Sequence, residues 1–117
     1  MKTIATQWLS GHTTAPGMLA CGLGEPDGNW FCHSADDVLC PREKLEQIIR
    51  QFPEANQLIA ANGLAPSSHT WVFAEGKIRS VTRPDGWILV IVTRGDAVAT
   101  RTLDGLTAEF LALQPGN

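Results

Sequence analysis

Trp87-Ile88-Leu89-Val90-Ile91-Val92 is the longest apolar run of the chain, six residues without a polar one. A strand with one wet face alternates apolar and polar residues, whereas a strand covered on both faces does not. The run therefore predicts a central strand in a sheet that carries helices on both faces. Since a membrane-spanning helix needs about 20 apolar residues, no membrane insertion is expected.

Turn residues precede this run and recur earlier in the chain. Pro84-Asp85-Gly86 stands directly before it, and Pro26-Asp27-Gly28 separates two other strand-like segments. Pro, Asp and Gly each favour a tight turn, so both sequences predict hairpins. Gly22 predicts a bulge in the strand before the first turn. The expected strands are residues 18–23, 29–34, 70–74, 77–82 and 87–92.

Two longer helices are expected. Residues 41–62 place apolar side chains at helical spacing, although Pro53 must kink this helix or split it in two. Residues 97–113 repeat apolar side chains in steps of three and four, with Asp96 or Thr102 as a candidate N-cap.

A short helix is expected over residues 3–10, so the element order is helix–β–β–α–β–β–β–α. Helices that interleave with hairpins are typical of an α+β fold. We therefore expect a five-stranded antiparallel sheet flanked by helices on both faces. The length of 117 residues predicts a single domain over residues 1–117.

Charge is scarce and unevenly distributed. The chain has 9 Lys and Arg against 12 Asp and Glu, or 18% charged residues, where about 25% is typical. The net charge of −3 leaves no basic footprint for nucleic acid, so no nucleic-acid partner is expected. Residues 4–24 and 55–74 contain no Lys, Arg, Asp or Glu. These two segments are the ones that we expect another protein chain to cover.

The chain has three cysteines, Cys21, Cys32 and Cys40, without a CxxC motif, and its first eight residues lack the apolar centre of a signal peptide. Both features favour a cytoplasmic location. With a two-residue turn after residue 25, Cys21 and Cys32 would stand directly opposite each other on paired strands, within disulfide reach.

Three interpretations of these residues stay open: buried reduced thiols, a redox-sensitive disulfide pair, and a zinc site that includes His33. The first is favoured, since free cysteine behaves as a small hydrophobic residue. The spacing fits no usual zinc ligand pair, so no metal is expected. A small-molecule or redox sensor that uses Cys21, Cys32 and His33 is the alternative function.

No Walker A, GxSxG, HExxH or EF-hand sequence is found. Gly22-x-Gly24-x-x-x-Gly28 is one residue too long for the dinucleotide fingerprint and enters a hairpin, where the fingerprint needs a helix. A nucleophile–base pair such as Cys32 with His69 is an open alternative, but a lone histidine near an apolar run is more often structural. We therefore expect a protein without enzymatic activity, catalytic residues or a cofactor.

Trp71 and Phe73 are two residues apart on one expected strand, so they share a face of the sheet. Core packing is one interpretation of the pair. The other is an exposed edge strand that pairs with a second chain. The uncharged segment 55–74 gives weight to the second interpretation.

Ala15-Pro16-Gly17-Met18-Leu19-Ala20-Cys21-Gly22-Leu23, followed by Pro26-Asp27-Gly28, resembles the opening strand of roadblock/LC7 (dynein light chain roadblock-type) domains. In that family a Pro-Gly-hydrophobic entry leads into a strand, a turn with Asp-Gly and a second strand. The long helix, the hairpin at residues 75–77, the apolar strand and the final helix then follow in the same order. The resemblance therefore covers nearly the whole chain.

The resemblance implies a homodimeric interaction or scaffold protein without enzymatic activity, often a regulator of a small Ras-like GTPase. It implies that the third strand, residues 70–74, pairs across a two-fold axis and that the long helices of the two copies pack together. The interface residues expected from it are Trp71, Phe73, Ile48 and Phe52. Pro53 departs from the family pattern because it interrupts the long helix.

Overall fold

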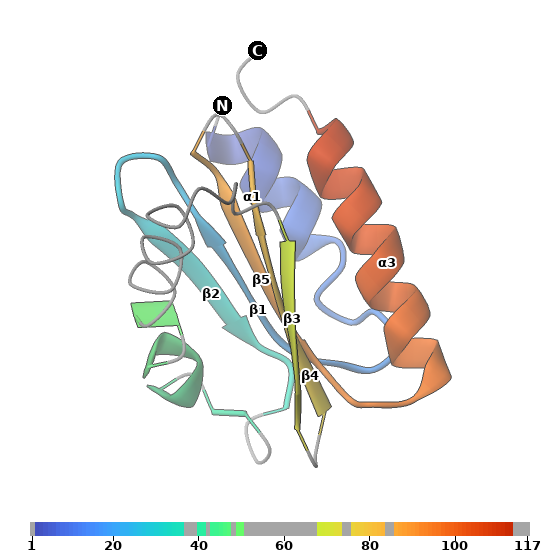
Figure 1. Ribbon diagram of the computed structural model, residues 1–117. Helices are drawn as coiled ribbons and strands as arrows, with labels where there is room; N and C mark the ends of the chain where they lie inside the picture. Colours follow the sequence, from blue (N-terminus) through green and yellow to red (C-terminus); the bar gives the residue numbers. More distant parts are fainter. Residues whose placement is uncertain are drawn as a thin grey trace, which may run out of the picture.

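The computed structural model describes residues 2–36, 40–41, 43–47, 49–50, 68–73, 76–83 and 86–113 (Figure 1). The elements in chain order are α1 (Lys2–Ser10), β1 (Met18–Gly24), β2 (Trp30–Ser34), β3 (Ser68–Phe73), β4 (Gly76–Thr82), β5 (Ile88–Thr93) and α3 (Ala97–Ala112). Residues 43–47 and 49–50 are also helical and are called the long-helix segment below. The expected kink or break at Pro53 lies outside the described residues.

The strands form one five-stranded sheet in the order β2-β1-β5-β4-β3, with every neighbouring pair antiparallel. β5 is the middle strand, and every residue after its first is buried. Leu89 and Ile91 pack into a core on one face, and Val90 packs into a core on the other. The doubly covered central strand expected from the apolar run is therefore confirmed.

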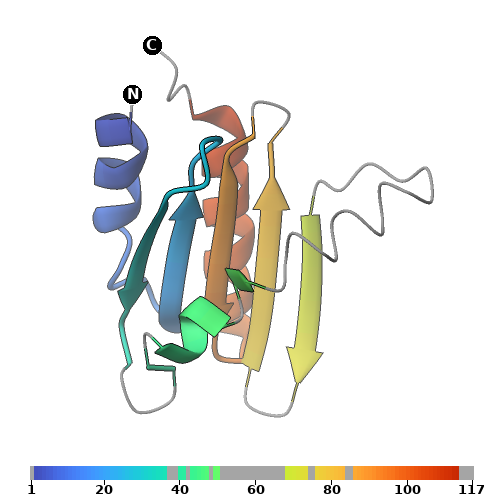
Figure 2. The same ribbon diagram turned by 90° about the vertical axis from the view of Figure 1, so that its left-hand side faces the viewer.

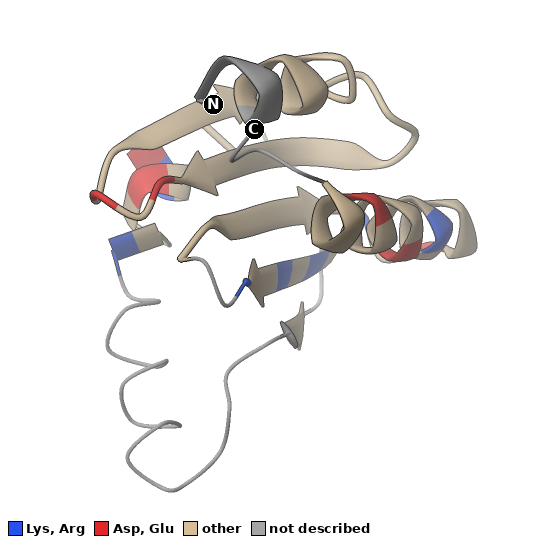
Figure 3. Ribbon diagram, turned by 90° about the horizontal axis from the view of Figure 1, so that it is seen from above, with Lys and Arg blue, Asp and Glu red and all other residues tan. Residues whose placement is uncertain are grey.

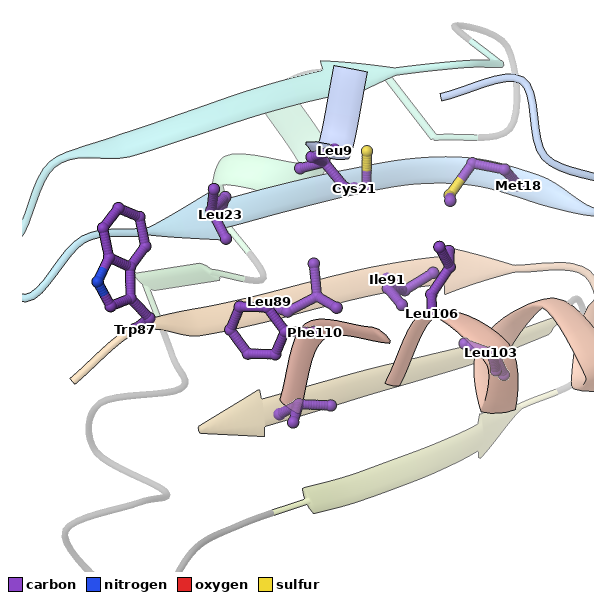
Figure 4. Close-up of a cluster of buried hydrophobic side chains, with 11 residues drawn as sticks. Leu9, Met18, Cys21, Leu23, Trp87, Leu89, Ile91, Leu103, Leu106 and Phe110 are labelled. Atoms are coloured by element: carbon purple, nitrogen blue, oxygen red, sulfur yellow. The ribbon is translucent and has the colours of Figure 1, made fainter. Parts of the chain in front are cut away.

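Two apolar cores lie on the two faces of the sheet. The first core lies against α1 and α3 (Figure 4) and comprises Leu9, Met18, Cys21, Leu23, Val81, Trp87, Leu89, Ile91, Leu103, Leu106 and Phe110. The second core lies against the long-helix segment and comprises Leu19, Ala20, Cys40, Leu45, Ile49, Ile78, Val90 and Val92. Figure 2 shows the long-helix segment in front of the sheet and α3 behind it. The α+β fold with helices on both faces is confirmed.

The first Pro-Asp-Gly sequence forms a hairpin turn, as expected. The Glu25 N–H donates to the Asn29 carbonyl at 2.8 Å, and the Gly28 N–H donates to the Glu25 carbonyl at 3.0 Å. Because residues 25 and 29 pair, the turn contains three residues, 26–28. Gly28 has a φ of 96° and Gly86, between β4 and β5, has 94°, a region that glycine enters without steric cost.

The prediction of a bulge at Gly22 is wrong. Gly22 lies in regular register with both neighbours, opposite Cys32 on β2 and Val90 on β5. It is instead a point of close approach, since a Cβ atom there would lie 2.9 Å from Cδ1 of Ile49. The irregularity in β1 falls earlier, between residues 18 and 20 where they face β5.

Asp96 directly precedes α3, and its carboxylate accepts a hydrogen bond from the Ala99 N–H at 2.8 Å. This confirms Asp96 as the N-cap. The Thr102 hydroxyl donates instead to the Pro16 carbonyl at 2.7 Å, which holds α3 against the chain that enters β1. No helix in the described ranges is long and apolar enough to cross a membrane.

Candidate protein-interaction interface

β3 lies at one edge of the sheet. Its residues pair with β4 from Ser68 opposite Val81 to Phe73 opposite Gly76, and among the described residues no strand pairs with its other side. An edge strand of this kind presents a row of backbone N–H and C=O groups to another chain. Its middle residues are exposed: Trp71 retains 38% of its surface and Val72 retains 73%.

The register places the side chains of β3 on two different faces. Trp71 stands opposite Ile78, which belongs to the second core, so Trp71 lies on the face of the long-helix segment. Thr70 stands opposite Arg79 and Val72 opposite Lys77, on the face that α3 covers. Of the two interpretations of Trp71, the exposed edge strand fits its exposure, and pairing of that strand with a second chain stays a prediction.

The other expected interface residues are less completely described. Phe73 ends β3, but its side chain lies outside the described part of the chain. Ile48 and Phe52 lie outside it altogether. Of the four interface residues expected from the sequence, the structure thus locates the side chain of Trp71 and the backbone of Phe73.

A polar connection between β4 and α3 escaped the sequence analysis. The Lys77 ammonium donates to the Thr100 hydroxyl at 2.8 Å, and the Arg79 guanidinium forms an ion pair with Asp104 at 2.8 Å. Figure 3 shows basic residues along β4 and acidic residues on α3. The sequence signal for this connection is the alternation of Lys77, Arg79 and Val81, which predicts that the three side chains share one face of the sheet. Spacing alone does not identify the residues of α3 that Lys77 and Arg79 contact.

The prediction that Cys21 and Cys32 stand directly opposite each other is wrong. With a three-residue turn the register moves by one, so Cys21 stands opposite His33 and Cys32 stands opposite Gly22. Cys21 packs in the first core, whereas Cys32 packs against the second, on the other face of the sheet. All three cysteines, including Cys40, lie among the described residues, and none of them is joined in a disulfide. The geometric basis of the redox pair is thereby lost.

Burial raises the pKa of the Cys21 thiol from 9.0 to about 12, and the Cys32 thiol adds to the effect. Between these two values the unfolded chain loses the Cys21 proton while the folded chain keeps it, so stability falls as the pH rises above 9. Compared with Cys21→Ala, the wild type is expected to lose about 1.4 kcal/mol more per pH unit in that window. Urea unfolding at several alkaline pH values measures this difference, and parallel curves for the two proteins would contradict it.

The Cys32–His69 catalytic pair is also wrong. His69 lies on β3 and Cys32 on β2, the two outermost strands of the sheet. Four strand spacings separate them, or about 19 Å. A nucleophile and its base must lie within hydrogen-bond reach. Within the described ranges, no group of three or more His, Cys, Asp or Glu side chains could hold a metal ion.

The five-stranded sheet with these helices on its two faces is the roadblock/LC7-type fold. The solved structure of MglB from Myxococcus xanthus matches with a TM-score of 0.60 and 9% sequence identity, over 90% of this chain and 86% of that chain. At this identity the likeness establishes the fold. No protein-family model matches the sequence, and no curated protein matches it.

Proposed function

We propose that this chain is a cytoplasmic homodimeric interaction protein without enzymatic activity, a single roadblock-type domain over residues 1–117 that regulates or scaffolds a small Ras-like GTPase. The observation that carries the proposal is the roadblock-type fold with β3 as its exposed edge. The chain shares its fold with MglB from Myxococcus xanthus, and the resemblance to roadblock/LC7 domains implies a small Ras-like GTPase as the partner.

In the proposed dimer, β3 pairs with β3 of the second copy, so that the two sheets become one. Edge strands that stay monomeric are commonly protected by charged residues or proline. β3 has neither between Ser68 and Phe73, and the whole segment 55–74 lacks charge. The backbone groups of this edge therefore suit pairing with a second, identical strand.

Light scattering is expected to report twice the mass of one chain at about 100 µM, a concentration at which an interface that is functional in cells stays occupied.

The partner class is tested with the Ras-like GTPase encoded nearest to this gene, loaded in turn with GDP and with a non-hydrolysable GTP analogue. We expect binding that depends on the nucleotide. A well-folded monomer at that concentration would refute the dimer, and equal absence of binding in both states would refute this GTPase as the partner.

A further inference from the structure

The Arg79 side chain contacts two elements at once. Its Nε donates to the hydroxyl of Thr70 on β3 at 3.0 Å, and its Nη1 donates to Asp104 at 2.8 Å and to Thr107 at 3.3 Å, both on α3. The Arg79 side chain is 16% exposed and Asp104 is 65% exposed. The bonds to Thr70 and Asp104 lie at the surface, and the bond to Thr107 is partly buried. A guanidinium is planar and rigid, so the three acceptors are held in one fixed geometry.

Lys77 provides the natural comparison. It lies on the same strand and the same face, two residues away, and its ammonium also bonds to α3, through Thr100. The residue opposite it on β3 is Val72, whose side chain has no hydrogen-bond acceptor. Both residues therefore connect β4 to α3, but the Arg79 bonds extend the connection to the edge strand.

The Thr70 bond matters because threonine has a stiff side chain with few rotamers. While the Thr70 hydroxyl accepts the hydrogen bond from Arg79 Nε, it is directed toward β4 and away from a strand that arrives at the outer edge of β3. The same bond limits how far the middle of β3 can twist away from β4. An edge strand held in one shape loses less conformational entropy when a second strand pairs with it.

We infer that Arg79 positions β3 for pairing with a second copy of the chain, by joining Thr70 to α3. This inference rests on the proposed function, since it presumes a dimer through β3. It also makes α3 part of the dimer mechanism: a contact that draws Asp104 away from Arg79 loosens the edge strand and weakens the dimer.

The test compares Arg79→Gln with Lys77→Gln, two variants with the same loss of charge. Arg79→Gln is expected to raise the dimer dissociation constant about tenfold, because β3 then loses more conformational entropy when a second strand pairs with it, and Lys77→Gln about twofold or less. Arg79→Lys keeps the charge but loses the planar fork, so it is expected to weaken the dimer in the same direction. Thermal unfolding checks that each variant is folded. Equal effects of the two Gln variants would overturn the inference.

Thr70→Val tests whether Arg79 acts on β3 through the hydroxyl of Thr70. Since Thr70→Val removes the accepting hydroxyl, adding it to Arg79→Gln is expected to change the dissociation constant by about twofold or less beyond Arg79→Gln alone. If the two substitutions instead raise the dissociation constant by independent factors that multiply, Thr70 is excluded as the link between Arg79 and β3.

Hydrogen exchange separates this inference from the proposed function. If the wild type is monomeric, the dimer fails, but Arg79→Gln must still speed amide exchange within β3 about tenfold relative to Lys77→Gln. Unchanged exchange in β3 would overturn the positioning role itself.

Discussion

Gly17→Ala is expected to lower the free energy of unfolding by about 3 kcal/mol, through backbone strain and a steric clash together. Gly17 has a φ of 81°, which L-residues rarely adopt. A Cβ atom there would lie 2.7 Å from Cβ and 2.9 Å from Cα of Ala99, at the start of α3. The Gly17 carbonyl also accepts the Arg94 N–H at 3.0 Å, so the chain has little freedom to move aside.

Two other glycines serve as controls for the same substitution. Gly28 has a φ of 96° but nothing within 4 Å of a Cβ, so Gly28→Ala is expected to show the strain alone, about 1 kcal/mol of destabilisation. Gly105 lies within α3 with open space around it, and Gly105→Ala is expected to stabilise by about 0.5–1 kcal/mol. Urea unfolding of the three variants measures the series. Equal effects for Gly17 and Gly28 would show that Ala99 does not restrict this site.

Trp71→Glu is expected to abolish the homodimer, with a dissociation constant raised about 100-fold or more. Trp71 lies at the middle of the exposed edge strand. In the proposed dimer, a two-fold axis through that edge would bring two copies of each substitution into one interface. Two carboxylates would then be desolvated close to each other, a cost of several kcal/mol. Light scattering across a dilution series measures the change in mass.

Val98→Glu is the matched control for this variant. Val98 is an exposed apolar residue, 47% accessible, in the first turn of α3, where a carboxylate is favoured by the helix dipole. It is expected to stay dimeric and folded. A dimeric Trp71→Glu protein with a normal circular dichroism spectrum would place the interface elsewhere, and a monomeric Val98→Glu protein would place it on α3.

The sequence predicts local features well where one physical cause dominates. The apolar run at 87–92 has no wet face, so it could lie only at the centre of the sheet, and β5 does. Asp96 precedes a helical pattern and caps it. Trp71 stands in an uncharged segment and is exposed at an edge. Each of these outcomes follows from the residue and its near neighbours.

The predictions failed where the local sequence allowed two answers or where the answer depended on a distant group. Pro-Asp-Gly fits turns of two or three residues, and the choice moved Cys21 from opposite Cys32 to opposite His33. Gly22 is required by Ile49, 27 residues further along, and not by a bulge. The spacing of residues in a sequence does not reveal a contact between residues so far apart in the chain.

The sequence by itself determined the order of the described elements, the two hairpins and the central strand. These depend on periodicity and turn chemistry, which act over a few residues. The roadblock-type fold was implied by the resemblance of the sequence to that family. The tertiary structure alone decided the register of β1 with β2, the separation of the thiols onto two faces, and the bonds from Arg79 to Thr70 and Asp104. Hydrogen bonds and close packing act over about 3–4 Å in space, whatever the distance along the chain.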